Sequence, residues 1–516
     1  MSWYLAAPIV IPFVTAVFAF LFRNGPEGRW ISVIGSAALL IASGLLMRVV
    51  LAEGVVAAQM GTWAAPFGIT LVADLLSAVM VVITGITALA VAVYALADID
   101  ARKEQLGYHA LFQVLLAGVV GSFLTGDVFN LYVWFEVMLI SSFGLLILGG
   151  RREQLDGGIK YVTLNLVSTI LFLSAIGLLY GMTGTLNMAD LHFAIQEVEN
   201  QGLVVVVAMM FMVAFGVKAA VFPLFFWLPA SYHTPSVAVS AIFAGLLTKV
   251  GVYALIRTFT LIFSGDIAYT HTILLWVAGF TMVTGVLGAA AMNDFRRILS
   301  FHIVSQIGYM ILGLALYTPL ALMGAVFYLV HHIIVKANLF LVAGVARRIA
   351  GSTELSAIGG LYKSAPLLGV LFLIPAFSLA GFPPLSGFWA KYIVVKAALD
   401  IEAWAIAGIA LVVGLLTIYS MTKIWGNAFW KPHPAGLEPK LSSLSMRDRA
   451  ALLSPIVALA VLTCVIGFYP EPFVQFAERA AGQLLDPTEY VQAVLGQGAL
   501  APEGGASQSA MLEVGE

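Results

Sequence analysis

Two lysines in neighbouring apolar segments are the residues of this chain best suited to carry protons. Lys218 and Lys249 lie within residues 211–257, each inside a long apolar run, and a Pro- and aromatic-rich turn at 223–235 separates the runs. An isolated ammonium at the centre of a bilayer costs on the order of 3 kcal/mol or more. Ionisable side chains kept at this depth indicate an ion or proton path. The alternative for Lys249, snorkelling to the membrane surface, does not fit its mid-segment position.

Glu136 is the expected counter-ion of Lys218. It lies at the centre of the apolar segment NLYVWFEVMLISSFGLL. Burial disfavours the charged form of each group, whereas pairing favours both charged forms, so a pair that opens and closes changes the proton affinity of the lysine. The alternative is a static buried ion pair that fixes helix packing, which is a weak source of stability. We therefore expect Glu136 and Lys218 to act as a functional pair.

The segment FYLVHHIIVKANLFLVAG adds two histidines and a third lysine. His332 and Lys336 are four residues apart and share one helix face, while His331 points about 100° away. Imidazole accepts and releases protons near neutral pH and can relay them between lysines. Hydrogen-bonded core histidines are the alternative. We expect at least one of the two to be a relay, with His332 preferred because it aligns with Lys336.

Lys391 follows a double proline at 383–384 and lies deep in its apolar segment, so we expect it to belong to the same path. Lys396 lies more than one turn nearer the outer end and is interpreted as a snorkelling lysine. His302 lies near the inner end of its segment, and two interpretations stay open for it, a structural role and a role in the proton path. The same holds for Asp74, whose position at an outer helix end is that of a cap.

The composition places all of these residues in a membrane. Of the 516 residues 61% are hydrophobic and 10% are charged, whereas a soluble domain has about 45–50% apolar and about 25% charged residues. The single cysteine, Cys464, excludes an internal disulfide and a cysteine metal site. P-loop, dinucleotide and metalloprotease motifs are absent from the sequence. We expect no cofactor, no metal, no nucleic acid and no enzymatic activity, so that an ion gradient or a partner must drive the chain.

Fourteen apolar segments approach the roughly 20 residues that a membrane-spanning helix requires. The first lacks a basic start and a clear cleavage site and is interpreted as a retained span. Loops after odd-numbered spans hold seventeen lysines and arginines, while the opposite loops and the tail hold only Arg257 and Arg479, with Arg48 near that side. This bias predicts that both termini lie outside. The predicted spans are 4–22, 30–50, 70–97, 108–125, 127–150, 159–181, 202–225, 237–260, 272–291, 299–317, 321–346, 365–397, 403–426 and 452–470.

The expected fold is an all-α membrane protein with two inverted five-helix repeats, spans 4–8 and 9–13. The seventh and twelfth spans each combine a lysine with a proline interruption, and paired broken helices mark the central site of many transporters. The tail begins with the amphipathic segment PFVQFAERAAGQLL, which we expect at the membrane interface. The predicted parts are an N-terminal three-helix segment at 1–107, the repeats at 108–260 and 272–426, a cytoplasmic loop with the last helix at 427–470, and an amphipathic and disordered tail at 471–516.

Several long stretches together resemble the antiporter-like membrane module that respiratory complex I shares with the multisubunit Mrp (Mnh) cation/proton antiporters. They cover nearly the whole chain to about Pro470, and LSFHIVSQIGYM with the lysine at 391 is most similar to the D subunits of the Mrp type. The resemblance implies a proton path at mid-membrane through Glu136, Lys218, Lys249, Lys391 and one of the two histidines. The stretches are WFEVMLISSF, FPLFFWLP, SAIFAGLLTKVGVYALIR, NDFRRILSFHIVSQIGYM, HHIIVKANLFLVAG and GFPPLSGFWAKY.

The resemblance implies a proton-translocating subunit of a sodium/proton antiporter in the bacterial inner (plasma) membrane. Its partners would be other membrane subunits, the lipid bilayer, protons and sodium ions. A proton-pumping subunit of a redox enzyme, such as complex I or a membrane-bound hydrogenase, is the alternative and would use the same lysines. A scaffold without transport activity is disfavoured because five lysines within spans are costly. The sequence contains no evident sodium site.

Overall fold

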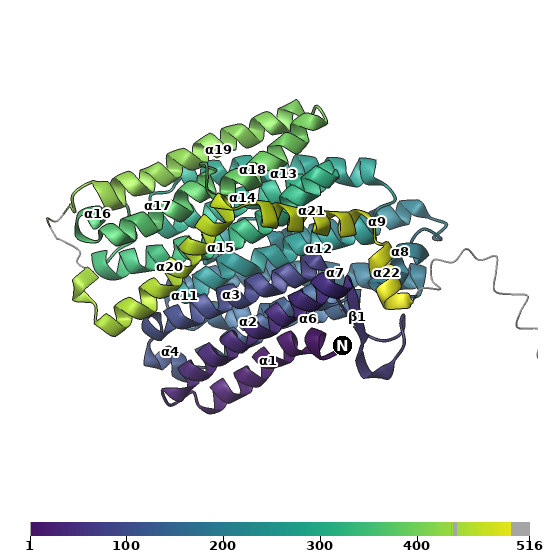
Figure 1. Ribbon diagram of the computed structural model, residues 1–516, viewed down its shortest axis with the longest axis horizontal. Coiled ribbons are helices and arrows are strands. Elements are labelled where there is room, and N and C mark those ends of the chain that lie inside the picture. The colour runs from purple at the N-terminus through teal and green to yellow at the C-terminus, as the bar shows by residue number, and fades with distance from the viewer. Residues whose placement is uncertain (1, 435, 437–440, 497–516) are drawn as a thin grey trace, which may run out of the picture.

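The computed structural model describes residues 2–434, 436 and 441–496, and helices that run side by side make up most of it (Figure 1). Among these residues, twelve helices are long and apolar enough to cross a membrane, and two shorter apolar helices, α5 and α17, occupy the places of the fourth and twelfth predicted spans. The expected all-helical membrane fold is thereby confirmed. The main helices of the bundle, these two included, are α1 Ser2–Leu21, α2 Glu27–Glu53, α3 Leu75–Asp98, α5 Tyr108–Leu124, α6 Val128–Ile147, α7 Arg152–Thr183, α9 Gln201–Ala219, α12 Thr248–Leu261, α13 Ile267–Ala291, α14 Phe295–Leu316, α15 Pro319–Ala350, α17 Pro366–Ala380, α18 Ser386–Asp400, α19 Trp404–Ile424 and α20 Met446–Phe468.

Shorter elements connect these helices. One crossing is composite, because α11, a π-helical turn η2 and α12 follow one another without a break from Val237 to Leu261. The remaining elements are α4 Ala101–Gln105, α8 Met188–Ala194, α10 Trp227–Ser231, α11 Val237–Ile242, η2 Phe243–Leu247, α16 Leu361–Ser364, η3 Trp425–Trp430, α21 Glu471–Leu485, α22 Thr488–Leu495, the 3-10 turns η1 Met60–Thr62 and η4 Leu441–Ser443, and the strands β1 Val56–Gln59 and β2 Thr70–Ala73.

The two strands were not predicted. They form an antiparallel hairpin, so the third span begins at Leu75 and not at residue 70. The β2 sequence TLVA is as apolar as the helix that follows, and hydropathy cannot separate them. The boundary is set by Asp74, whose carboxylate accepts the backbone N–H of Ser77 as an N-cap. The predicted capping role of Asp74 is thus confirmed.

Both predicted helix interruptions are present. α9 ends at Ala219, where Ala220 takes a left-handed conformation (φ 60°), and α10 begins at Trp227. α17 ends at Ala380, Gly381 has φ 91°, and α18 begins at Ser386. A left-handed residue directly after a helix is a common C-cap, and the helix ends leave carbonyl groups without intrahelical partners. The relation of the two halves as inverted repeats stays a prediction.

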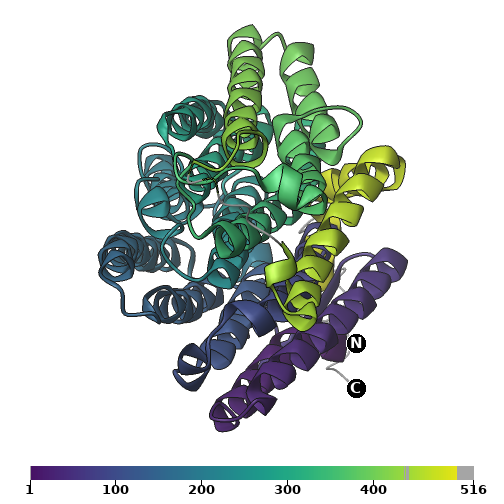
Figure 2. The same ribbon diagram turned by 90° about the vertical axis from the view of Figure 1, so that its left-hand side faces the viewer.

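α15 lies at the centre of the bundle. It packs against α3, α11, η2, α14, α17, α18, α20 and α21. The N-terminal helices α1 and α2 and the helices α18 and α19 lie on opposite flanks of the bundle (Figure 2), whereas α20 and α21 pack against α3. Most of α15 and α14 is buried, so the polar residues in the middle of these helices cannot reach water or lipid headgroups directly, whereas Arg297 and Arg348 near their ends are exposed.

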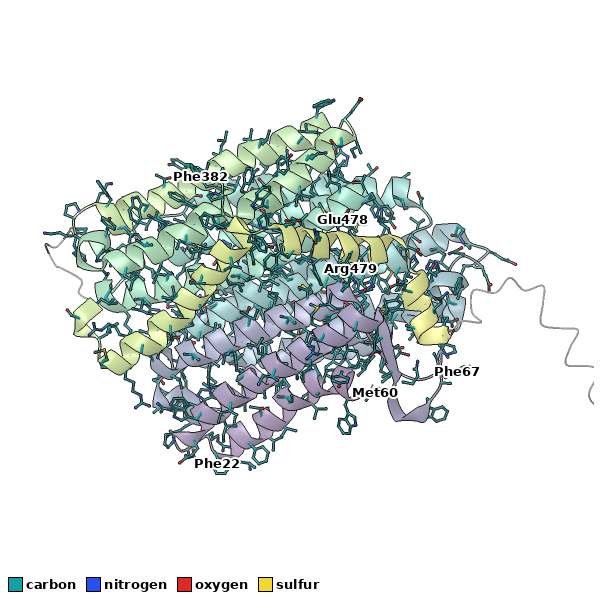
Figure 3. The ribbon with its side chains drawn as sticks, viewed as in Figure 1. Phe22, Met60, Phe67, Phe382, Glu478 and Arg479 are labelled. Atoms are coloured by element: carbon teal, nitrogen blue, oxygen red, sulfur yellow. The ribbon has the colours of Figure 1, made fainter. Side chains whose placement is uncertain are left out.

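The amphipathic C-terminal segment packs against the bundle. α21 follows α20 and lies along α15 and α3 (Figure 1), with Ala477, Ala481 and Leu484 buried. Glu478 and Arg479 point outward (Figure 3). This differs from a helix lying freely at the membrane interface, because the small residues of α21 allow close contact with α15. The predicted disordered tail lies outside the described residues from position 497 onward.

Candidate proton path

Lys218 and Glu136 lie in one site but do not touch. Lys218 is in the last turn of α9, directly before the interruption, and its Nζ atom lies 5.7 Å from the ring centroid of Phe135. Among the described residues no ion pair within 4.0 Å joins Lys218 to Glu136, although their charges are close enough to interact. One carboxylate oxygen of Glu136 is buried without a hydrogen-bond partner. The expected direct contact is therefore absent, and Lys218 packs on the aromatic ring beside Glu136.

A small cavity adjoins Lys218. Its volume is about 20 Å³, and Tyr161, Asn165 and Trp227 contribute to its lining. A cavity of roughly 10–15 Å³ by this measure is enough for one water molecule when polar partners are present. The Tyr161 hydroxyl lies 2.6 Å from the Ser142 hydroxyl. Lys218 thus has room for one water molecule and a hydroxyl pair nearby.

Lys249 is the second residue of α12, which begins directly after the π-helical turn η2. Its ammonium donates a hydrogen bond to the Ala244 carbonyl within that turn. π-Turns inside α-helices occur frequently at functional sites. Gly251 brings this helix against the end of α9, because a Cβ atom there would lie 2.5 Å from the backbone nitrogen of Ala219. A glycine at this position therefore lets the Lys249 helix approach the Lys218 helix.

The polar residues of α15 contact different neighbouring helices. Lys336 donates to the Leu299 carbonyl of α14 at 3.1 Å. His332 is fully buried, and neither ring nitrogen has a hydrogen-bond partner in the protein. His331 places Nδ1 2.8 Å from the Ser386 hydroxyl at the start of α18, the helix that carries Lys391. The two histidines thus have different surroundings.

Lys391 uses the second helix interruption. Its ammonium donates to the carbonyl of Ala380, the last residue of α17, at 3.1 Å. It also lies 5.0 Å from the ring centroid of Tyr309. Lys396 in contrast is exposed and pairs with Asp400 at 2.5 Å. The different surroundings agree with the separate roles expected for these two lysines.

Sequence reasoning misplaced or missed several polar residues. Arg257 was assigned to an outer loop, but it lies within α12, buried, and pairs with Asp74 at 2.5 Å. Hydropathy places a span end near any arginine, and only the structure shows that a carboxylate 183 positions away neutralises it. His302 is buried, with its Nε2 2.6 Å from the Ser420 hydroxyl. On α14 the polar residues His302, Gln306 and Tyr309 recur at helical spacing, a signal the sequence already contained.

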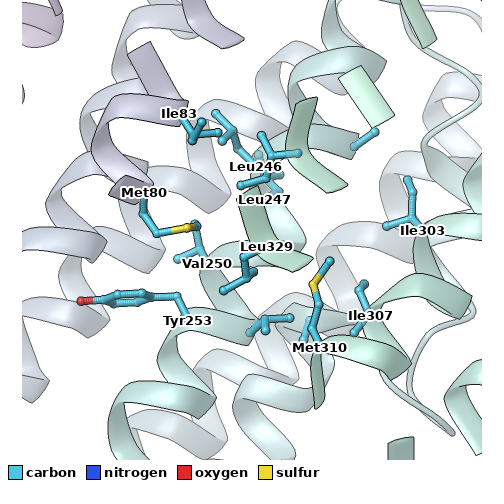
Figure 4. Close-up of a cluster of buried hydrophobic side chains, with 14 of the residues drawn as sticks. Met80, Ile83, Leu246, Leu247, Val250, Tyr253, Ile303, Ile307, Met310 and Leu329 are labelled. Carbon is cyan, nitrogen blue, oxygen red and sulfur yellow. The ribbon is translucent and has the colours of Figure 1, made fainter. Parts of the chain in front are cut away.

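Several buried polar atoms without protein partners lie on α14 and α15, and one lies on α12. Buried polar groups are almost always hydrogen-bonded to protein or to ordered water, so this pattern favours a hydrated file. Apolar side chains of the same helices, together with side chains of α3 and η2, form a buried cluster between them (Figure 4). The helices that carry the lysines also pack in series, α9 on α12, η2 on α15, and α15 on α18. On these helices the unpartnered atoms belong to Thr248, Arg296, His302, Ser305, Gln306, His331, His332 and Asn338. The labelled residues of the apolar cluster are Met80, Ile83, Leu246, Leu247, Val250, Tyr253, Ile303, Ile307, Met310 and Leu329.

A helical membrane bundle with interrupted helices and a series of buried lysines and histidines is the architecture of an ion-translocating membrane protein. Residues 125–417 match the family described as "NADH:quinone oxidoreductase/Mrp antiporter, TM", and the chain belongs to this family. Over 96% of its length it is 47% identical to the D subunit of a Na(+)/H(+) antiporter from Alkalihalophilus pseudofirmus, and the match covers 100% of that relative.

Two solved structures extend the comparison. A chain of the Mrp complex from Dietzia sp. superposes with a TM-score of 0.88 at 36% identity, covering 96% of this chain and 100% of that one. A chain of the membrane-bound sulfane sulfur reductase, an archaeal respiratory membrane complex, also has a TM-score of 0.88, at 25% identity, covering 95% of this chain and 99% of that one. The fold is therefore common to antiporters and respiratory complexes.

Proposed function

We propose that this chain is the proton-translocating D subunit of a multisubunit sodium/proton antiporter. The observation that carries the proposal is the 47% identity to an antiporter D subunit over the full length of that relative. The respiratory neighbour has the same fold at 25% identity. The chain is thus a transporter subunit without catalytic activity of its own, and it works with other membrane subunits in the bacterial plasma membrane.

The proposed path runs through Glu136, Lys218, Lys249, the α15 residues and Lys391. Each buried lysine has a backbone carbonyl or an aromatic ring as its neighbour instead of a carboxylate. Neighbouring cations lower each other's proton affinity, so the protonation of one lysine favours proton release from the next. Protons pass only over hydrogen-bond distances, and bridging water must fill the remaining gaps.

The Glu136–Lys218 pair is proposed to start each cycle. When the carboxylate approaches Lys218, the ion pair holds the lysine proton; when the two separate, the proton affinity of Lys218 falls and the proton moves on toward Lys249. Support comes from the separated arrangement of the pair and from the cavity beside Lys218, which has room for one water molecule. His332 is proposed to connect Lys249 with Lys336, and His331 to connect α15 with Lys391.

The proposed activity can be tested by measuring sodium/proton exchange in vesicles that contain the assembled complex. Everted membrane vesicles from a strain without other sodium/proton antiporters are prepared with the full complex, and a pH-sensitive dye reports the pH gradient. Addition of sodium is expected to dissipate the gradient, and Lys218→Ala is expected to abolish the response at unchanged subunit level. Proton pumping that requires an electron donor, with no response to sodium, would instead favour the redox-enzyme alternative.

A further inference from the structure

Lys391 has no carboxylate partner among the described residues, although it is buried. Two groups contact its ammonium, the Ala380 carbonyl at 3.1 Å and the ring of Tyr309 at 5.0 Å from the centroid. The face of an aromatic ring carries negative partial charge and attracts a cation within about 6 Å, more strongly when water is excluded. The ring of Tyr309 is therefore well placed to stabilise the charged form of Lys391.

Tyr309 is fixed in this position. Its hydroxyl donates to the Ala410 carbonyl of α19 at 2.5 Å, so the polar edge points away from Lys391. Its ring also stacks on Tyr328 of α15, at 5.3 Å between centroids and an angle of 12°. Tyr328 is itself held by a 2.5 Å hydrogen bond to Gln306. Both rings are fully buried, and together they form a rigid support that offers its face to the lysine.

The other charged and titratable groups around Lys391 repel its ammonium when they are protonated. They are His331 and Lys336 on α15 and His302 on α14. α17 carries no charged side chain, and on α19 and α20 the charged residues, Lys423, Arg447, Asp448 and Arg449, lie at the cytoplasmic-loop ends. None of these groups is a negatively charged partner for the Lys391 ammonium.

We propose that Tyr309 is a positioning residue whose ring face holds the protonated form of Lys391 within the membrane, so that this lysine can accept a proton from the α15 histidines. This inference rests on the proposed role of Lys391 in proton transfer. It assigns to a neutral ring the part that Glu136 plays for Lys218. The tyrosine does not itself relay a proton, because its hydroxyl donates to the Ala410 carbonyl and points away from Lys391.

A series of ring substitutions tests the proposal with little change in shape. Position 309 is converted to Phe and then, by nonsense suppression, to phenylalanines with one, two and three ring fluorines, each of which weakens the negative face. The alkaline midpoint of sodium-driven exchange is measured in vesicles for each complex. Relative to the Phe variant, the midpoint is expected to move progressively to lower pH, by roughly half to one pH unit across the series. Tyr309→Leu should give the largest shift.

Two controls make the result decisive. The same fluorinated residues at Phe372, a buried ring that packs on Phe295 and Phe429, should leave the midpoint unchanged. Co-purification of the other subunits reports assembly; if Tyr309→Phe does not assemble, fluorinated tyrosines, which keep the bond to Ala410, replace the series. A midpoint that stays constant across the series, while Lys391→Ala abolishes exchange, overturns the inference alone. Normal exchange by Lys391→Ala overturns the proposed path and the inference with it.

Discussion

At the scale of single residues, the buried lysines are held by neutral groups. Lys249, Lys336 and Lys391 each donate to a backbone carbonyl, and Lys218 lies over an aromatic ring. A carbonyl accepts a hydrogen bond from an amine in either protonation state, whereas a fixed carboxylate strongly favours the ammonium. Neutral partners therefore keep the two states of each lysine closer in free energy, as a proton carrier requires.

Glu136 is the one carboxylate in the proposed path, and we expect its negative charge to be essential for exchange. Glu136→Gln keeps the size and polarity of the side chain but removes the charge that attracts Lys218. We expect it to reduce sodium/proton exchange at least tenfold in the vesicle dye assay, with normal complex assembly. Lys218→Ala should be equally inactive. Normal exchange by either variant at a normal protein level would contradict the pairing.

The two lysines of α18 are expected to differ in effect. Lys391→Ala should abolish exchange, because it removes a buried carrier. Lys396→Ala removes only an exposed ion pair with Asp400, a contact of small value at a surface, and should leave the exchange rate within about twofold of the wild type. Side-by-side measurement in the same vesicles checks this, and equal losses would mean that α18 is placed wrongly.

At the scale of elements, the path depends on close helix contacts that glycine permits. Gly251 lets α12 meet the end of α9. A side chain at this position would force the two helices apart and lengthen the gap between Lys218 and Lys249. The π-helical turn before Lys249 has a related effect, because it exposes the Ala244 carbonyl to the ammonium.

Gly251→Val is therefore expected to lower exchange more than tenfold while all titratable residues remain. The clash is with backbone atoms, so it cannot be relieved by a side-chain rotation. Gly177→Val on α7 is the matched control, since nothing lies within 4 Å of a Cβ atom there. Exchange and subunit content are measured for both variants. Equal activity of the two would show that the α9–α12 contact does not matter for transfer.

A polar cluster between α2, α4 and α5 predicts a pH-dependent stability. Glu104 accepts from Arg29 at 2.9 Å and lies 3.3 Å from His109. Burial alone would raise the pKa of the Glu104 carboxyl, but the His109 hydrogen bond and the Arg29 charge hold it below its usual value. A depressed pKa stabilises the folded state at pH values above the unfolded pKa of about 4.3, and this contribution is lost as pH falls through the folded pKa.

Glu104→Gln is thus expected to lower the melting temperature of the detergent-solubilised complex at neutral pH. The difference from the wild type should narrow below about pH 4, where the wild-type carboxyl also becomes protonated. Thermal melts between pH 3.5 and 7.5 measure this. Glu53→Gln, which changes a carboxylate with no ion pair among the described residues, is the control. A constant difference at all pH values would contradict the assigned cluster.

At the scale of the whole molecule, both described ends of the chain lie at one end of the bundle. α22 packs against β1 and α8, and α1 also contacts β1. An even number of crossings requires this arrangement. The lysine and arginine bias predicts that this end faces outward.

Cysteine labelling on intact cells tests that orientation. In a Cys464→Ser background, a cysteine at Glu489 on α22 should react with a membrane-impermeant maleimide. A cysteine at Lys431, in the loop after η3, should react only after the cells are opened. The reverse pattern would place both termini in the cytoplasm and contradict the predicted orientation.

Much of this architecture follows from composition and proline placement. Long apolar runs require spanning helices in a bilayer, and the prolines near 223 and 383 predicted both interruptions. The hairpin before α3 and the Asp74–Arg257 pair were missed because they depend on contacts between distant segments. The lysines were found because ionisable residues are rare in apolar runs. The groups that contact these lysines were not predicted, because any residue has a backbone carbonyl and the sequence does not show which ring face a lysine meets.

The helices α21 and α22, which are synthesised late, cover residues that are synthesised much earlier. Gln483 of α21 accepts the backbone N–H of Leu75 at the start of α3, 408 positions earlier, and the ring of Tyr490 lies 5.1 Å from the guanidinium of Arg257. During translation, the Asp74–Arg257 pair therefore enters the membrane before its cover exists. Biogenesis then has a late closing step, and a ribosome that stops before α21 releases a chain with this ion pair uncovered at the membrane surface, which quality-control proteases can recognise.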